Sequence, residues 1–256
     1  MAKREDNIQA RLEHDLAELK LLQIAKGYRE VLDQAARKGS SMLEVLATLF
    51  GMEQTARQQR ALERRLLQAR LPKQKILAEY DFNFPKRIPK ATILRLFDCD
   101  FIPRHGCAVL IGPTGTGKSH LLTALGYTVC ERGYSVRYTR VVDMINHLTT
   151  AQMNGLLGKA LKIYVRPSLL LLDELGYLPI DKRGADLLFQ VVAARYETGS
   201  IVLSTNRPFR EWGTLFDVDN TLATALIDRL MHHGEAIVIQ GDSYRMRGKD
   251  SDPPSA

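Results

Sequence analysis

Hydrophobic positions near the start of the chain follow helical spacing. Ile8, Leu12, Leu16, Leu19 and Leu22 recur every three or four positions, as on one face of an amphipathic helix. This stripe is most simply the core of a small domain, although it could instead dock another subunit or a partner protein.

Helix signals continue beyond a break at Lys38-Gly39-Ser40. Ser41 and Glu44 then stand three apart ahead of an apolar run, which is the pattern of a capping box. The helical pattern ends near Pro72, because proline cannot continue a helix. We therefore predict an all-helical N-terminal domain over residues 1–80.

Residues 81–105 interrupt this regularity. Phe82, Phe84, Pro85, Pro89 and Pro103 punctuate a stretch with little periodicity. We expect a linker that lies over the following domain.

From residue 106 onward, short apolar runs alternate with amphipathic stretches. The runs occupy 108–111, 136–138, 169–172, 201–203 and 236–239, and the helical stretches occupy 118–131, 141–161, 182–197 and 220–233. Buried strands that alternate with helices predict an α/β domain whose parallel sheet is covered on both faces. We assign it residues 106–248 and expect a disordered tail over 249–256.

Composition and charge limit which classes of protein are possible, but they do not identify the function. The chain has 36 Lys+Arg against 29 Asp+Glu, a net charge of +7, which suits an anionic partner. Its 3 cysteines form no CxxC pair and favour free thiols in a reducing compartment. The charged N-terminus and the lack of a long apolar run lead us to expect a cytoplasmic protein with no signal peptide and no membrane partner.

The most specific motif follows the first predicted strand. It matches G-x-x-x-x-G-K-[ST] and consists of Gly112, Pro113, Thr114, Gly115, Thr116, Gly117, Lys118 and Ser119. A strand before it and a helix after it are the context in which this pattern binds nucleotide phosphates. Backbone N–H groups would cradle the phosphates, Lys118 would reach the β- and γ-phosphates of ATP, and the Ser119 hydroxyl would bind Mg²⁺.

Two later strands end in polar groups. Four leucines lead into Asp173, which suits the second magnesium-organising acid of a P-loop site, and into Glu174, which could act as general base toward the attacking water. Asn206, after the run at 201–203, could position that water and touch the γ-phosphate. A polar strand end can equally be a structural cap.

These motifs together resemble the AAA+ ATPases, and more closely the IstB helper ATPases of insertion sequences. The resemblance rests on DELGYLP at 173–179, STNRPF at 204–209, ALIDRL at 225–230 and DSYR at 242–245. It covers residues 1–248, and the related DnaC helicase loaders share much of this layout.

The resemblance implies two further catalytic groups. Arg229 matches the arginine finger that enters a neighbouring subunit's site, and Arg245 matches the sensor-2 arginine that reads the γ-phosphate. Outside the resemblance, each could simply be a surface arginine in a salt bridge. Because only 11 residues follow Arg245, we expect no C-terminal helical lid, as in IstB and DnaC.

A basic stretch lies between residues 57 and 75. It contains Arg57, Arg60, Arg64, Arg65, Arg70, Lys73 and Lys75 with one acid, Glu63. Such a stripe can follow a phosphate backbone without recognising bases, although a solvated helix face has the same pattern. Further candidates for DNA contact are Lys159, Lys162, Arg166, Lys182 and Arg183.

Two remaining features are less specific. Phe82 and Phe84 could pack near the adenine or serve as plain hydrophobic anchors. The adjacent pair His232 and His233 is expected to be structural, since neighbouring rings on a helix point about 100° apart and make a poor metal site.

The sequence thus predicts a helical domain followed by a lidless AAA+ domain that hydrolyses ATP with Mg²⁺. In the IstB reading, ATP drives homo-oligomeric assembly on duplex DNA, which prepares a target site and recruits the element's transposase. Two alternatives remain open at this stage: a DnaC-type loader of a replicative helicase, and a non-hydrolytic, ATP-switched DNA scaffold.

Overall fold

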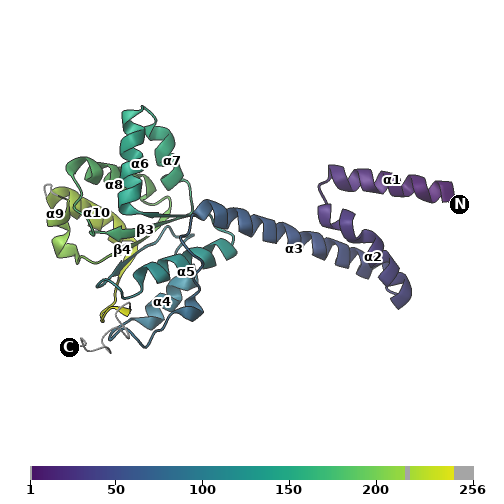
Figure 1. Ribbon diagram of the computed structural model, residues 1–256, viewed down its shortest axis with the longest axis horizontal. Coiled ribbons are helices and arrows are strands. Elements are labelled where there is room, and N and C mark those ends of the chain that lie inside the picture. Colours follow the sequence, from purple (N-terminus) through teal and green to yellow (C-terminus); the bar gives the residue numbers. More distant parts are fainter. Residues whose placement is uncertain (1, 217–219, 245–256) are drawn as a thin grey trace, which may run out of the picture. The chain divides into compact units, whose positions relative to one another are not determined.

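The computed structural model describes residues 2–216 and 220–244 (Figure 1). The chain divides into two compact units, Met1–Arg64 and Arg65–Ala256. This boundary lies within the long helix α3 (Met42–Ala69), whereas the sequence places the end of the helical domain at residue 80. The two units are described separately below.

The N-terminal unit consists of helices. They are α1 (Ala2–Glu18), α2 (Leu22–Lys38) and the first part of α3. The expected capping box forms, because the Ser41 amide donates to Glu44 Oε2 at 2.7 Å and the Glu44 amide donates to Ser41 Oγ at 3.3 Å. Gly39 ends α2 in the left-handed conformation, with φ 67°.

The N-terminal core differs from the expected apolar stripe. Leu16 is buried and packs in a cluster with Ile24 and Tyr28, but Ile8 and Leu19 are 62% and 65% exposed. Leu19 leaves the face of α1 because the helix ends at Glu18, whereas Ile8 lies within α1 and is exposed there.

A buried carboxylate joins α3 to the start of α2. Glu53 Oε2 accepts the amide of Gln23 at 2.7 Å and that of Ile24 at 3.4 Å. Glu53 Oε1 accepts from Arg57 at 3.2 Å and from Arg60 at 3.1 Å. A residue on one helix thereby satisfies the free amides at the N-terminus of another.

The C-terminal unit is built on a five-stranded parallel sheet of order β2-β3-β4-β1-β5. The strands are β1 (Cys107–Ile111), β2 (Val136–Arg140), β3 (Leu169–Leu175), β4 (Ser200–Thr205) and β5 (Gly234–Val238). Every residue of β4 is buried, as expected for a central strand with both faces covered. The predicted α/β class and parallel sheet are confirmed.

Helices cover both faces of this sheet (Figure 1). One face packs against α5 (Lys118–Glu131), and the other packs against α6 (Val141–Met153), α8 (Lys182–Arg195) and α10 (Asn220–His232). The remaining elements are α4 (Lys90–Phe97), α7 (Leu157–Val165), α9 (Trp212–Leu215) and the 3-10 turns Leu77–Glu79 and Phe209–Glu211. No helix follows β5 within the part of the chain that the structure describes.

A buried arginine closes the edge of the sheet where the strands begin. Arg195 is 1% exposed, and its guanidinium donates to five backbone carbonyls at 2.7–3.1 Å. These carbonyls belong to Tyr164, Val165, Pro167, Ser168 and Ser200. Burial lowers the pKa of Arg195 to about 10, so the group stays charged at neutral pH.

Two sequence expectations require correction. The segment expected to be a linker contains α4, which is too short and too closely flanked by prolines to show a period. The single helix expected over 141–161 is two helices, because Gly155 adopts a left-handed φ of 69° between α6 and α7. Among the described residues, no helix is long and apolar enough to cross a membrane.

Candidate functional site

The loop at 112–119, which the sequence predicts to bind phosphates, lies at the carboxyl end of β1 and leads directly into α5. Gly117 caps α5 with φ 87°, and a Cβ atom there would lie 2.5 Å from the Tyr80 ring. Only glycine fits both constraints, so the residue type is set by backbone conformation and by close packing. The loop amides therefore lie at a helix N-terminus, where the helix dipole favours an anion.

The loop lysine is held inside its own loop. Lys118 is 4% exposed, and its Nζ donates to the carbonyls of Gly112 and Pro113, each at 2.7 Å. Thr116 Oγ1 also donates to the Pro113 carbonyl, at 2.9 Å. These contacts hold a positive charge at the point where the sequence places the terminal phosphates.

A cavity of about 620 Å³ opens beside this loop. Residues 114–119 and Glu174 line one part of it, and the segment 72–85 together with Tyr244 lines another. Phe84 and Tyr244 meet edge to face, with ring centroids 4.9 Å apart. A polar loop beside an aromatic wall suits a molecule with a phosphate chain and a flat base.

Tyr80 connects the aromatic wall to the loop. Its hydroxyl donates to the Thr116 carbonyl at 2.9 Å, and its ring contacts Phe82 edge to face. Burial, with a smaller contribution from Asp81, raises the pKa of Tyr80 to about 12, so it remains a donor at neutral pH. Phe84 lines the cavity, whereas Phe82 supports Tyr80.

Two lysines of the predicted basic stretch also line this cavity. Lys73 and Lys75 stand among its residues, beyond the end of α3. Their charge therefore lies beside this cavity and not along α3.

The Asp173 carboxylate near the end of β3 is 1% exposed and held by two hydroxyls. Tyr138 on β2 donates to Oδ2 at 2.7 Å, and Ser204 on β4 donates to Oδ1. Burial and the adjacent Asp173 charge raise the pKa of Tyr138 well above its ordinary value, so Tyr138 stays protonated. The carboxylate is therefore fixed in orientation by groups on both neighbouring strands.

Glu174 points differently from Asp173 because the strand is irregular there. The β3–β4 register shifts between Leu172 and Leu175, and Glu174 has φ 63°, a left-handed conformation that is uncommon for glutamate. A bulge of this kind re-aims a side chain. Glu174 is half-buried and lines the same cavity as the loop, and its amide donates to Ser204 Oγ at 3.1 Å.

Asn206 follows β4. This strand lies between β1, which leads into the loop, and β3, which carries the two acids. The Oδ1 atom of Asn206 is buried and finds no donor among the described residues. A buried acceptor without a partner requires an explanation, and a bound water or ligand group is the ordinary one. Because β1, β3 and β4 are parallel neighbours, residues 112–119, Asp173, Glu174 and Asn206 all lie where these strands end, at the carboxyl edge of the sheet.

Arg229 lies at the opposite edge of the sheet. It lines a small cavity with Cys107, the first residue of β1, and β1 then runs five residues before the phosphate loop. At about 3.3 Å per residue, the five steps from Cys107 to Gly112 span about 16 Å along the strand. Arg229 Nη1 donates to the Ala225 carbonyl at 3.0 Å, and its guanidinium lies 4.7 Å from the Phe189 ring centroid.

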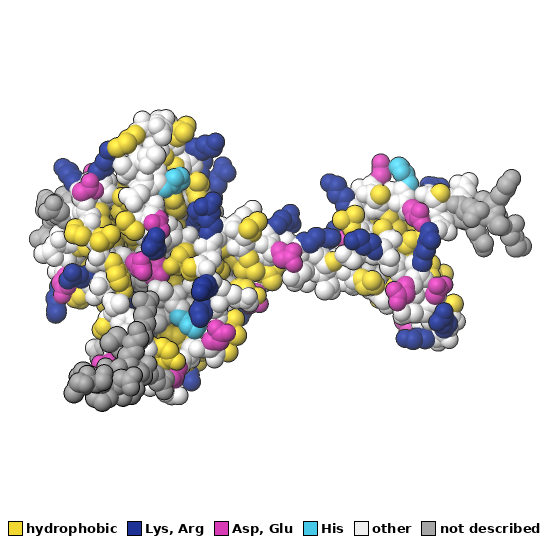
Figure 2. Space-filling view, in the orientation of Figure 1, with side chains coloured by type: hydrophobic (Ala, Val, Ile, Leu, Met, Phe, Trp, Pro, Cys, Tyr) yellow, Lys and Arg dark blue, Asp and Glu magenta, His cyan; other side chains and the backbone are white. Residues whose placement is uncertain are grey.

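The candidate DNA-binding arginines have unequal surroundings. Dark blue Lys and Arg side chains follow α3 in Figure 2. Arg57 and Arg60 pair with Glu53 within the N-terminal unit, and Arg65 donates to the Cys130 carbonyl at 2.9 Å within the C-terminal unit. Arg64 is exposed. The other expected arginine, Arg245, lies outside the described residues.

The order of the strands and the arrangement of their ends give the C-terminal unit the AAA+ fold of P-loop proteins. Solved structures share this fold: AMPPCP-bound DnaA from Aquifex aeolicus superposes with TM-score 0.56 at 22% identity, covering 68% of this chain and 52% of that one. DnaI superposes with TM-score 0.55 at 18% identity, covering 70% and 92%.

The family follows from sequence comparison. The family model described as IstB-like ATP binding protein matches residues 14–252, and the chain belongs to this family. An IS21 insertion-sequence ATP-binding protein from Pseudomonas aeruginosa is 37% identical over 93% of this chain and 89% of its own length. The IS5376 counterpart from Geobacillus stearothermophilus is 35% identical, with coverages of 88% and 90%.

The sequence reasoning missed the residues that support the acids and the loop. Tyr138, Ser204 and Tyr80 were not among its candidates, although each makes a hydrogen bond to a site group. Tyr138 lies in a strand whose polar positions could have signalled a buried partner. Its pairing with Asp173 is invisible along the chain, because 35 residues separate the two.

Proposed function

We propose that this protein hydrolyses ATP with Mg²⁺, using residues 112–119 for the phosphates. The observation that carries the proposal is the convergence of that loop, two carboxylates and a buried amide oxygen without a donor at one edge of the sheet. Lys118 supplies charge to the phosphates, and the oxygens of Ser119 and Asp173 suit Mg²⁺, which prefers oxygen ligands. The ion itself would neutralise charge on the transferred phosphoryl group.

The same geometry supports separate roles for the two acids. Both carboxylate oxygens of Asp173 accept hydrogen bonds from hydroxyl groups, so the carboxylate is held in one orientation beside the place where Mg²⁺ would bind. Glu174 lines the open cavity, where a carboxylate can accept a proton from water. Asn206 is suited to orient that water through its buried amide.

Completion of the site requires a second subunit in this proposal. Arg229 lies at the sheet edge opposite its own phosphate loop, so it cannot reach the nucleotide of the same chain. A guanidinium group supplied by a neighbouring subunit stabilises the negative charge on the phosphoryl group during its transfer. An oligomer in which Arg229 enters the next subunit's site supplies this group, and the ATPase activity then depends on assembly.

We assign this ATPase the task of a transposition helper. ATP-driven assembly on duplex DNA would select and prepare the target and recruit the element's transposase, whose contact triggers hydrolysis. The insertion-sequence relatives, which match about nine-tenths of the chain, support this assignment. The net charge of +7 is compatible with a duplex partner, and exposed Arg64 is one candidate contact.

The deciding experiment measures particle mass. The full chain is mixed with duplex or single-stranded DNA of equal length, in the presence of ADP or of a slowly hydrolysed ATP analogue. We expect large assemblies only with duplex DNA and the ATP analogue. A Lys118→Ala chain, which loses the charge that binds phosphates, should remain small under every condition.

Other outcomes would overturn parts of this assignment. Assembly confined to single-stranded DNA would favour the helicase-loader alternative, which uses the same ATPase core. Assembly on duplex DNA that is followed by no ATP hydrolysis, even with transposase present, would favour a nucleotide-switched scaffold.

A further inference from the structure

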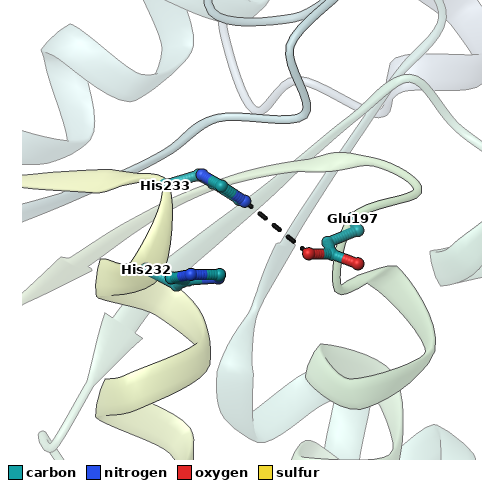
Figure 3. A group of neighbouring side chains, drawn as sticks. All are labelled: Glu197, His232 and His233. Carbon is teal, nitrogen blue, oxygen red and sulfur yellow. Dashed lines mark ion pairs between the residues drawn. The ribbon is translucent and has the colours of Figure 1, made fainter.

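Three metal-ligating side chains meet at the end of α10, away from the nucleotide cavity. Glu197, His232 and His233 each offer a ligand atom, and these atoms all lie within 4.8 Å of one another (Figure 3). Glu197 comes from the loop between α8 and β4, and the histidines come from the junction of α10 and β5. Two segments that are distant in sequence therefore contribute to one cluster.

The histidine pair does not have the divergent geometry expected of helix neighbours. Helix α10 ends at His232 and β5 begins at Gly234, so His233 follows a non-helical path. The two ring centroids are consequently only 4.2 Å apart, with an interplanar angle of 34°. Because the backbone changes direction at His233, the rings of the two adjacent histidines lie close together and can both bind one ion.

The distance between two of the ligand atoms is close to the value that a bound ion requires. His233 Nε2 and Glu197 Oε1 are 3.7 Å apart, which is too far for a good hydrogen bond. Two tetrahedral ligands at about 2.0–2.1 Å from a zinc ion would be separated by about 3.4 Å. A shift of a few tenths of an ångström would let both atoms reach one ion.

Surrounding groups pre-position two of the three ligands. The Tyr196 hydroxyl lies 2.5 Å from His232 Nδ1, and this contact orients the His232 ring. Second-shell contacts of this kind orient metal-binding histidines. Glu197 has φ 57°, a left-handed conformation that carries its carboxylate toward the rings (Figure 3).

We propose that Glu197, His232 and His233 bind a divalent transition-metal ion of the zinc class. Two imidazoles and one carboxylate suit Zn²⁺, Co²⁺ or Ni²⁺ and do not suit Mg²⁺, which prefers oxygen ligands. All three residues are exposed, so a fourth position remains open to water or to a donor from another molecule. This proposal rests on the cluster alone and is independent of the proposed ATPase mechanism.

The metal cluster lies beside Arg229, so a bound ion would affect the helix that carries this arginine. Tyr196, Glu197 and His233 line the same small cavity as Arg229. An ion here ties the α8–β4 loop to the end of the helix that carries Arg229. Metal binding would therefore restrict the movement of the arginine that we propose to act on a neighbouring subunit.

The test is a titration of the full chain with Co²⁺ and Zn²⁺, in excess Mg²⁺ and without nucleotide or DNA. Co²⁺ absorption reports the ligand set, and competition with a chromophoric chelator gives the zinc affinity. We expect one ion per chain, with affinity lowered at least about tenfold by His233→Ala and by Glu197→Gln. His14→Ala is the matched control, since His14 faces Glu18 at 3.9 Å on an exposed helix.

Two results would overturn the proposal: no stoichiometric binding by the wild-type chain, or equal binding by wild type and the His232→Ala/His233→Ala variant. Circular dichroism of each variant separates loss of ligands from loss of fold, and Glu197→Gln preserves the size of the side chain. Because nucleotide and DNA are absent, failure of the proposed ATPase mechanism would leave this measurement unaffected.

Discussion

At the scale of single residues, two adjacent carboxylates have different environments. Asp173 is buried and receives hydroxyl donors from Tyr138 and Ser204, whereas Glu174 is turned toward the cavity by a left-handed backbone. Burial and hydrogen bonding suit the first group for holding a cation in place. Access to the cavity suits the second for contact with water.

Glu174→Gln should therefore separate binding from hydrolysis. The amide keeps the shape of the side chain but cannot accept a proton, so we expect ATP affinity to persist and turnover to fall by about a hundredfold or more. Nucleotide binding and phosphate release are measured on the same preparation. Asp186→Asn, on the exposed side of α8, serves as control, and normal turnover in Glu174→Gln would remove Glu174 from the mechanism.

Tyr138→Phe tests the support of Asp173. Loss of the hydroxyl removes one of two donors that orient this carboxylate, and loss of such a partner typically costs about ten- to a hundredfold in metal affinity. We expect the Mg²⁺ concentration for half-maximal ATPase activity to rise by a similar factor. Tyr134→Phe, just before β2, is the control. An unchanged Mg²⁺ dependence would make Tyr138 a packing residue only.

At the scale of elements, the N-terminal unit depends on a carboxylate that caps a helix in a different part of its sequence. Burial alone would raise the pKa of Glu53, but hydrogen bonds from the Gln23 and Ile24 amides and from Arg57 lower it overall. A lowered pKa means that the folded state favours the charged form. The resulting stability is complete above the ordinary carboxyl pKa of 4.5 and is lost as the pH falls through the lowered value.

Acidification should accordingly loosen the start of α2. We expect hydrogen-exchange protection of the α2 amides to decrease as the pH falls below about 4.5, after correction for intrinsic exchange. Glu53→Gln should show reduced protection already at neutral pH, and little further loss on acidification. Glu30→Gln, on the exposed face of α2, should behave as wild type. Equal protection in Glu53→Gln and wild type would contradict the capping role.

At the scale of the whole molecule, the parallel sheet separates the phosphate loop from Arg229. The loop follows the last residue of β1, and Arg229 lies beside the first. The length of β1, whose three central residues are buried, lies between them, so no side-chain rotation brings Arg229 to the phosphate loop of its own chain. Assembly into an oligomer is the simplest way in which this arginine can take part in catalysis.

Arg229→Ala should bind ATP normally and hydrolyse it slowly. Loss of an arginine finger typically lowers turnover by about a thousandfold or more. Subunits with Lys118→Ala and intact Arg229 should partly restore activity on mixing, since each variant supplies what the other lacks. Arg132→Ala controls for loss of a surface charge. Absence of any rescue would argue against action between subunits.

The sequence by itself determined that the loop at 112–119, the two acids after the leucine run and Asn206 lie at or next to strand ends, as the structure shows. Each is a local pattern in which residue type and spacing follow from backbone geometry at a strand end. The boundaries of α5 were also set locally, since the predicted range 118–131 matches Lys118–Glu131. Alternation of apolar runs and amphipathic stretches sufficed for the parallel sheet.

Only the tertiary structure decided which distant groups meet. The Tyr138–Asp173 and Ser204–Asp173 contacts, the position of Lys73 and Lys75 beside the nucleotide cavity, and the cluster at Glu197 depend on strand order and on where helices end. Such contacts are fixed by packing between elements, which leaves no periodic trace along the chain. For the same reason, the apolar stripe could not show that Leu16 is buried while Ile8 and Leu19 are exposed, because burial depends on which elements pack against the helix.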